Sequence, residues 1–167
     1  MIGFVESAVL SHYAREADAV KAGYLDDSLA LPSASRRYVR IYDGAPQLTK
    51  PNAIIYGARG GPAKVEYWVF GDTSPSPPHL WGIDPSKWAW VGGYIDWASI
   101  GKDHRLVRRR YWSDGNVRGP GADAYPTKND ILEVAELSRL PNIVSVMSFP
   151  PAWHLYIDLK GRTLGTR

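Results

Sequence analysis

The sequence contains no cysteine, and this absence removes several classes of protein at once. Without thiols there is no disulfide framework, no thiolate zinc site and no cysteine nucleophile. The fold must therefore be held by packing alone. Redox chemistry gives no indication of the compartment.

Long apolar runs are also missing. No run approaches the roughly 20 residues that span a bilayer, so no membrane span is expected. Residues 1–6 lack the basic flank and apolar stretch of a secretory signal, and we expect a protein used without Sec export. The hydrophobic content of 44% and charged content of 22% are typical of a globular chain that buries a core.

Neither sign of charge is in large excess, since the net charge is only +3, but the charges are unevenly distributed along the chain. Residues 1–35 and 66–101 are acidic overall, whereas residues 36–65 and 102–118 are basic. Such blocks predict opposed patches that meet another chain or pair with each other within the fold. Pairing within the fold is the commoner explanation.

Aromatic residues are abundant but unusual in kind, with seven Trp and ten Tyr against three Phe. Trp and Tyr combine an apolar body with a polar atom, which suits half-buried positions at interfaces and in binding grooves. They also serve as bulky filler in a small β-rich core, and the sequence leaves both interpretations open.

The N-terminal region predicts an amphipathic helix over residues 5–22, ended by Gly23. Its expected core positions recur at spacings of three and four: Val5, Ala8, Val9, His12, Tyr13, Ala17 and Val20. Residues 25–35 contain a proline and three serines and are predicted to form a loop.

From residue 37 the apolar period changes to two, which predicts a strand-rich body over residues 37–112. Strands are expected at 38–42, 53–56, 64–70, 88–97 and 105–112, with Gly92-Gly93 as a bulge or bend in the fourth. The 64–70 strand carries aromatic residues beside a charge, so neither of its faces is expected to be solvent-exposed. Residues 72–87 form a proline-rich loop.

The C-terminal part predicts a helix over 128–140, which starts after a capping-box-like Thr127. Two strands within 142–159 follow, separated by a proline pair. With about seven short strands and two helices, the fold class is α+β. We expect a single domain over 1–167, built on a mixed or antiparallel sheet or sandwich.

The segment 104–112 combines arginines with Tyr and Trp and could contact phosphates and stack bases. Alternation on a strand, however, sends Arg108 and Arg110 one way and Arg109 the other. A protein interface is favoured over nucleic acid, because arginine is enriched there too. The residues expected at an interface are Trp81, Trp88, Trp90, Trp97, Arg105, Arg108, Arg110, Tyr111 and Trp112.

Trp81, Trp88 and Trp90 could instead line a carbohydrate-binding platform, although Asn and Gln are scarce around them. The four histidines show no His-x-His or His-x-x-x-His spacing that would predict a metal site. His79 and His104 would be catalytic only if the fold gathered them with Glu66, Asp96 or Asp114. Residues 57–64 fail as a phosphate-binding loop, because Pro62 displaces the required Gly-Lys pair and a strand follows.

As a whole the chain resembles small accessory proteins of tailed bacteriophage particles. The resemblance lies in composition: no cysteine, short strands, Pro/Gly-rich loops and abundant Trp and Tyr. It implies a non-enzymatic structural or assembly subunit of a tail, connector or capsid, located in the virion or the host cytoplasm. Its partners would be other subunits, including copies of itself, and it would need no cofactor, metal or catalytic residue. An enzyme or effector that acts on nucleic acid or a nucleotide, through the basic-aromatic strand 104–112, is the first alternative.

Overall fold

The computed structural model describes residues 2–27, 35–40, 42, 45–70, 76–100, 106–112 and 143–159. The chain divides into two compact units. The terminal unit comprises Met1–Trp68 and Leu155–Arg167, and the central unit comprises Val69–His154. The expectation of one domain over 1–167 stays a prediction.

The N-terminal region is helical, as predicted, but it forms two helices where one was expected over 5–22. Helix α1 spans Ile2–His12 and helix α2 spans Glu16–Lys21. The chain is extended at Arg15, whose backbone N–H donates to the Asp18 carboxylate at 3.0 Å and so begins a new helix. The side-chain hydrogen bond from Arg15 lowers the pKa of Asp18.

This interruption changes which residues reach the core. Val5, Val9 and Tyr13 are buried as expected, but His12, Ala17 and Val20 are exposed. On α2 the buried residue is Ala19. A single uninterrupted helical period therefore cannot describe residues 5–22, because the second helix starts with a new phase.

Helix α2 ends in a Schellman motif. The N–H of Gly23 donates to Val20 O at 2.9 Å, and the N–H of Tyr24 donates to Ala19 O at 3.0 Å. Gly23 has φ +87°, a left-handed conformation that glycine adopts without strain. The predicted helix end at this glycine is confirmed.

We expect Gly23→Ala to lower the free energy of unfolding by about 1–2 kcal/mol, because a side chain disfavours this φ. The Arg40 guanidinium, 3.4 Å from the added Cβ, is flexible and can move, so backbone strain dominates. The matched control is Gly3→Ala on α1, where a Cβ meets nothing within 4 Å. It should stabilise by up to about 1 kcal/mol, since alanine favours helix. Urea denaturation measures both, and equal effects of the two substitutions would contradict the prediction.

A six-stranded sheet has the order β1-β2-β3-β4-β9-β5. Its strands are β1 (Leu25–Asp26), β2 (Arg36–Val39), β3 (Ala53–Tyr56), β4 (Pro62–Phe70), β5 (Trp88–Val91) and β9 (Ala152–Asp158). The pairs from β1 to β4 are antiparallel. The α+β class with an antiparallel sheet is thus confirmed. Strand β1 corrects the prediction that residues 25–35 are loop throughout.

The second sheet has three antiparallel strands in the order β7-β6-β8, namely β6 (Tyr94–Ile100), β7 (Leu106–Trp112) and β8 (Ile143–Phe149). The expected strand 88–97 is in fact two strands, β5 and β6, which belong to different sheets and are separated by Gly92-Gly93. A 3-10 turn, Pro85–Lys87, precedes β5 within the expected loop. The predicted helix 128–140 lies outside the described residues.

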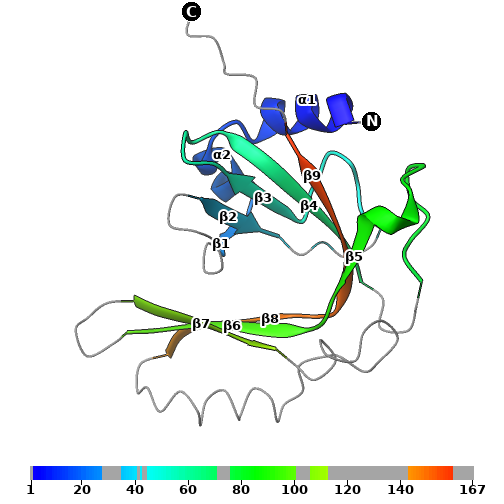
Figure 1. Ribbon diagram of the computed structural model, residues 1–167. Coiled ribbons are helices and arrows are strands. Elements are labelled where there is room, and N and C mark those ends of the chain that lie inside the picture. The colour runs from blue at the N-terminus through cyan, green and yellow to red at the C-terminus, as the bar shows by residue number, and fades with distance from the viewer. Residues whose placement is uncertain are drawn as a thin grey trace, which may run out of the picture. The chain divides into compact units, whose positions relative to one another are not determined.

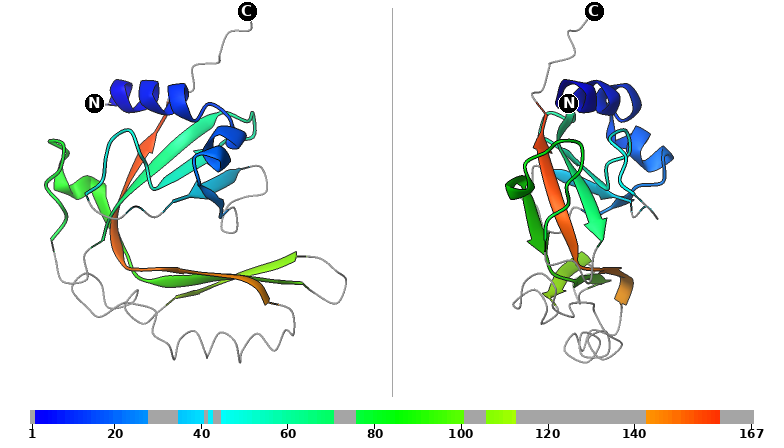
Figure 2. Two further views of the ribbon diagram at one scale, coloured as in Figure 1. Left: turned by 180° about the vertical axis from the view of Figure 1, so that it is seen from behind. Right: turned by 90° about the vertical axis from the view of Figure 1, so that its right-hand side faces the viewer.

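The helices α1 and α2 cover one face of strands β2–β4 in the terminal unit (Figures 1 and 2). Tyrosine hydroxyls fasten this layer and the nearby loops to the sheet. The bonds are Tyr56 to Tyr13 O (2.9 Å), Tyr38 to Glu16 Oε2 (2.8 Å), Tyr24 to Pro51 O (2.6 Å), Tyr67 to Leu48 O (2.7 Å) and Tyr42 to Tyr24 Oη (3.1 Å). Burial raises the pKa of the phenols of Tyr24, Tyr38, Tyr42, Tyr56 and Tyr67, that of Tyr38 to about 12. In this unit these tyrosines are therefore core and anchoring residues.

Candidate functional site

The chemically richest group among the described residues is a buried ion cluster, formed by Asp27, Arg37 and Glu66 in the terminal unit. Asp27 follows β1, Arg37 lies on β2 and Glu66 lies on β4. Their exposed fractions are 0%, 6% and 4%. Charged side chains are almost never buried this deeply unless they are paired.

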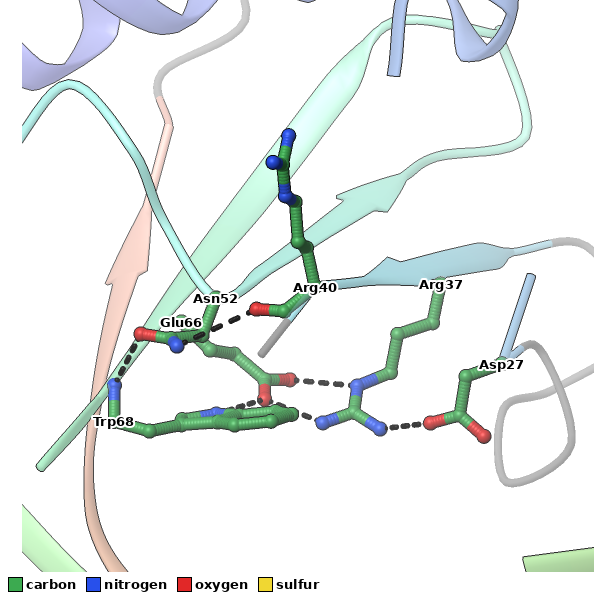
Figure 3. Close-up of polar contacts among 6 residues, drawn as sticks. All are labelled: Asp27, Arg37, Arg40, Asn52, Glu66 and Trp68. Carbon is green, nitrogen blue, oxygen red and sulfur yellow. Dashed lines mark hydrogen bonds and ion pairs between the residues drawn. The ribbon is translucent and has the colours of Figure 1, made fainter. Parts of the chain in front are cut away.

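Arg37 lies between the two carboxylates (Figure 3). Its Nε and Nη2 donate to Oε1 and Oε2 of Glu66 at 3.2 and 2.7 Å, a bidentate pairing, while Nη1 donates to Asp27 Oδ2. A planar guanidinium matches a carboxylate in this way and gains from two parallel charge-assisted bonds. The Arg37 guanidinium carbon also lies 5.4 Å from the centre of the Trp68 ring.

Trp68 and Asn52 extend this cluster. Trp68 Nε1 donates to Glu66 Oε2 at 3.2 Å, and the backbone N–H of Trp68 donates to Asn52 Oδ1 at 2.8 Å. Asn52 Nδ2 in turn donates to Arg40 O at 3.4 Å. The three charged side chains are almost inaccessible to solvent, and their hydrogen bonds connect β2 with β4 and with the residue that follows β1.

A small hollow adjoins Trp68 and Asn52 in the same unit. Its volume is about 140 Å³, and the described residues that line it are Tyr42, Ala45, Pro46, Gln47, Lys50, Asn52 and Trp68. Residues 47–50 form a turn in which the Lys50 N–H donates to Gln47 O at 2.9 Å. This turn places the two side chains as neighbours at the hollow. We call this feature the Trp68 hollow.

The expected interface tryptophans lie in the central unit, and ring contacts are described for three of them, Trp81, Trp88 and Trp90. Trp88 is only 4% exposed, and its ring centre is 6.3 Å from that of Trp81. Trp90 packs edge-on against Trp153 at 5.5 Å. Trp88 therefore offers little ring surface to a sugar or a partner, whereas Trp81 and Trp90 are half-buried.

The basic-aromatic segment is a strand, as predicted, and it lies at one edge of the β7-β6-β8 sheet. Register places Arg108 opposite Ala98, Arg110 opposite Asp96, Tyr111 opposite Ile95 and Trp112 opposite Tyr94, while Trp97 pairs with Arg109. Arg105 lies outside the described residues. The roles of these residues at an interface, or on nucleic acid, stay predictions.

The histidines form no site within the described part of the chain. His12 and His79 are exposed, His154 is buried on β9, and His104 lies outside the described residues. Glu66, one of the carboxylates considered for catalysis, is committed to Arg37. Within the ranges described, no group of three or more His, Cys, Asp or Glu side chains could hold a metal ion.

Residues 57–61 are a turn between β3 and β4, where the Gly57 N–H donates to Gly61 O at 2.9 Å.

Comparisons with protein-family models, with curated protein sequences and with solved structures find no match. Among the described helices, none is long and apolar enough to cross a membrane.

Sequence reasoning missed Asp27, Arg37 and Asn52 as the residues of greatest chemical interest. A signal was present in the charge blocks, since Asp26-Asp27 ends the acidic block and Arg36-Arg37 opens the basic one. Arg36 pairs with Asp26 at 3.5 Å, and Arg37 pairs with Asp27. Where the acidic block 1–35 meets the basic block 36–65, these charges therefore pair within the fold.

Proposed function

We propose that this protein is a non-enzymatic subunit of a larger protein assembly, and that α1 is one of its contact surfaces. The observation that carries the proposal is the apolar character of α1 on more than one side. Val5 and Val9 are fully buried, yet Ile2 and Phe4 are 51% and 57% exposed. The helix has Glu6 as its single charged residue before His12.

A helix at the surface of an isolated domain normally turns charged side chains to water. The exposed positions of α1 instead include two large apolar side chains, which supports a second protein surface packed over Ile2 and Phe4. The closed state of the ion cluster supports the non-enzymatic part of the proposal, because its charges connect strands. The compositional resemblance is the reason to name a tailed-phage virion as the assembly, with other subunits or copies of this chain as partners.

The test is size-exclusion chromatography with light scattering, for the protein alone and with neighbouring particle proteins. We expect association that weakens at least about tenfold in the Ile2→Ser/Phe4→Ser variant, because burying each side chain contributes about 1.5–3 kcal/mol. The matched control is Val20→Ser on α2, whose side chain is 54% exposed. It should leave association unchanged. A parent protein that stays monomeric and binds no neighbouring subunit would contradict the proposal.

A further inference from the structure

We propose that the Trp68 hollow binds a carboxylate group, carried either by a small organic acid or by an acidic side chain of a peptide. The inference is independent of the α1 surface and rests on the hydrogen-bond donors, charge and size of this hollow. Each of these is given by residues of the terminal unit alone.

The charged side chain in the described lining of the hollow is a lysine. Lys50 is exposed at its edge, and no acidic side chain in the described part of the chain forms an ion pair with it. The described lining includes no Asp or Glu. The Glu66 carboxylate that accepts from Trp68 Nε1 is paired with Arg37. The guanidinium carbon of Arg40 lies 4.9 Å from the ring centre of Tyr42, and its Nη1 donates to Ala22 O.

A buried donor lies in the wall. Asn52 is 2% exposed, and its Oδ1 accepts from the Trp68 backbone N–H, which fixes the orientation of the amide (Figure 3). Its Nδ2 carries two hydrogens but makes one hydrogen bond among the described residues, a long one of 3.4 Å to Arg40 O. In the proposed complex the remaining N–H donates to the bound carboxylate. An acceptor there would offset the cost of a buried donor, about 1–3 kcal/mol.

The size of the hollow restricts the ligand. Its volume of about 140 Å³ has room for several waters. Sites for drug-sized ligands occupy about 300–1,000 Å³, so the hollow suits a smaller group than these ligands. Tyr42, Pro46 and Trp68 supply apolar walls for a short alkyl stem.

The donor set matches a carboxylate. One ammonium and an amide N–H, with the Gln47 amide beside them, suit a single negative charge that is shared by two acceptor oxygens. A neutral amide of the same shape would present an NH₂ group to these donors and lose the attraction of Lys50. Discrimination between acid and amide is therefore the property to measure.

The experiment is a titration of the ¹⁵N-labelled protein by NMR with three probes: propionate, a blocked Gly-Asp-Gly peptide and its Gly-Asn-Gly counterpart. We expect saturable chemical-shift changes at the backbone N–H of Trp68 and the side-chain amide of Asn52. The dissociation constant for an acidic probe should be about 1 mM. Saturation by propionate equal to that by the acidic peptide identifies a free acid as sufficient. Stronger binding of the peptide identifies a protein ligand.

Lys50→Gln should weaken binding of the acidic probe at least about fivefold, since it removes the charge. The side chain is exposed, so the fold is retained. Lys21→Gln, at an exposed position on α2, is the matched control and should bind as the parent does. Three results would overturn the proposal: equal binding of the Asp and Asn peptides, unchanged binding in Lys50→Gln, or no saturable shift up to about 10 mM.

Discussion

Replacing Arg37 with alanine is expected to lower the free energy of unfolding by about 3–5 kcal/mol. The substitution leaves the Asp27 and Glu66 carboxylates in the core without the guanidinium that lies between them. It also removes the cation beside the Trp68 ring. Urea denaturation followed by circular dichroism measures the loss.

The neighbouring residue provides the control. Arg36 also pairs with an aspartate next to β2, at 3.5 Å, but its side chain is 57% exposed and that of Asp26 is 35% exposed. Water screens this pair, so Arg36→Ala should cost only about 0–1 kcal/mol. The two variants remove the same side chain from adjacent positions. Equal losses in the free energy of unfolding would show that the buried Arg37 pairs stabilise the fold no more than the exposed Arg36 pair does.

Stability should fall steeply above about pH 10, because burial raises the pKa of five phenols above the ordinary value near 10. Between the ordinary and the raised pKa, the unfolded chain has lost protons that the folded chain still holds. The free energy of unfolding therefore decreases with pH, by up to about 1.4 kcal/mol per pH unit for each tyrosine. Below about pH 9 the phenols should cause no change.

The measurement combines urea denaturation at pH 8 to about 11 with the near-ultraviolet absorbance of tyrosinate. In the folded protein the part of the absorbance that comes from these five phenols should rise late and together with loss of structure, whereas in concentrated urea it should follow the ordinary pKa. Tyr38→Phe removes one of the five phenols and should make the decline shallower, by up to about 1.4 kcal/mol per pH unit. Ionisation of all ten tyrosines with an unchanged circular dichroism spectrum would show that these five hydroxyls do not secure the fold.

Local patterns predicted much of the fold. The 53–56 strand has the same bounds as β3, and the 64–70 strand falls within β4, where Val65 and Glu66 are both buried as expected of a strand with no solvent face. These segments are rich in β-branched and aromatic residues, which fit a pleated sheet packed on both sides. Gly23 marked a helix end because a left-handed residue is needed there.

The errors arose where a tertiary contact decides the outcome. The N-terminal helix breaks near Tyr13 and Arg15, whose carbonyl groups accept from the Tyr56 hydroxyl more than 40 residues away. Strand β1 exists because β2 pairs with it, and two residues carry too little periodicity to be recognised alone.

The candidate site was less predictable than the fold. The Trp68 hollow and the ion cluster bring together β1, β2, β4 and the 45–52 loop, and spacing along the chain gives no measure of such convergence. The tryptophan and arginine patterns, by contrast, were visible in the sequence, and their predicted role in contacts stays a prediction.

The doubled charges Asp26-Asp27 and Arg36-Arg37 have a consequence for how the strands find their alignment. Because successive side chains point to opposite faces, sliding β2 by one residue would turn Arg37 toward the tyrosines beneath the helices. Either Arg36 or Tyr38 would take its place, and a slip that brings Tyr38 there would confront a phenol with two buried carboxylates. Apolar residues would tolerate such an offset far better than these ions do. The cluster thereby disfavours the slip that would replace its guanidinium with a phenol.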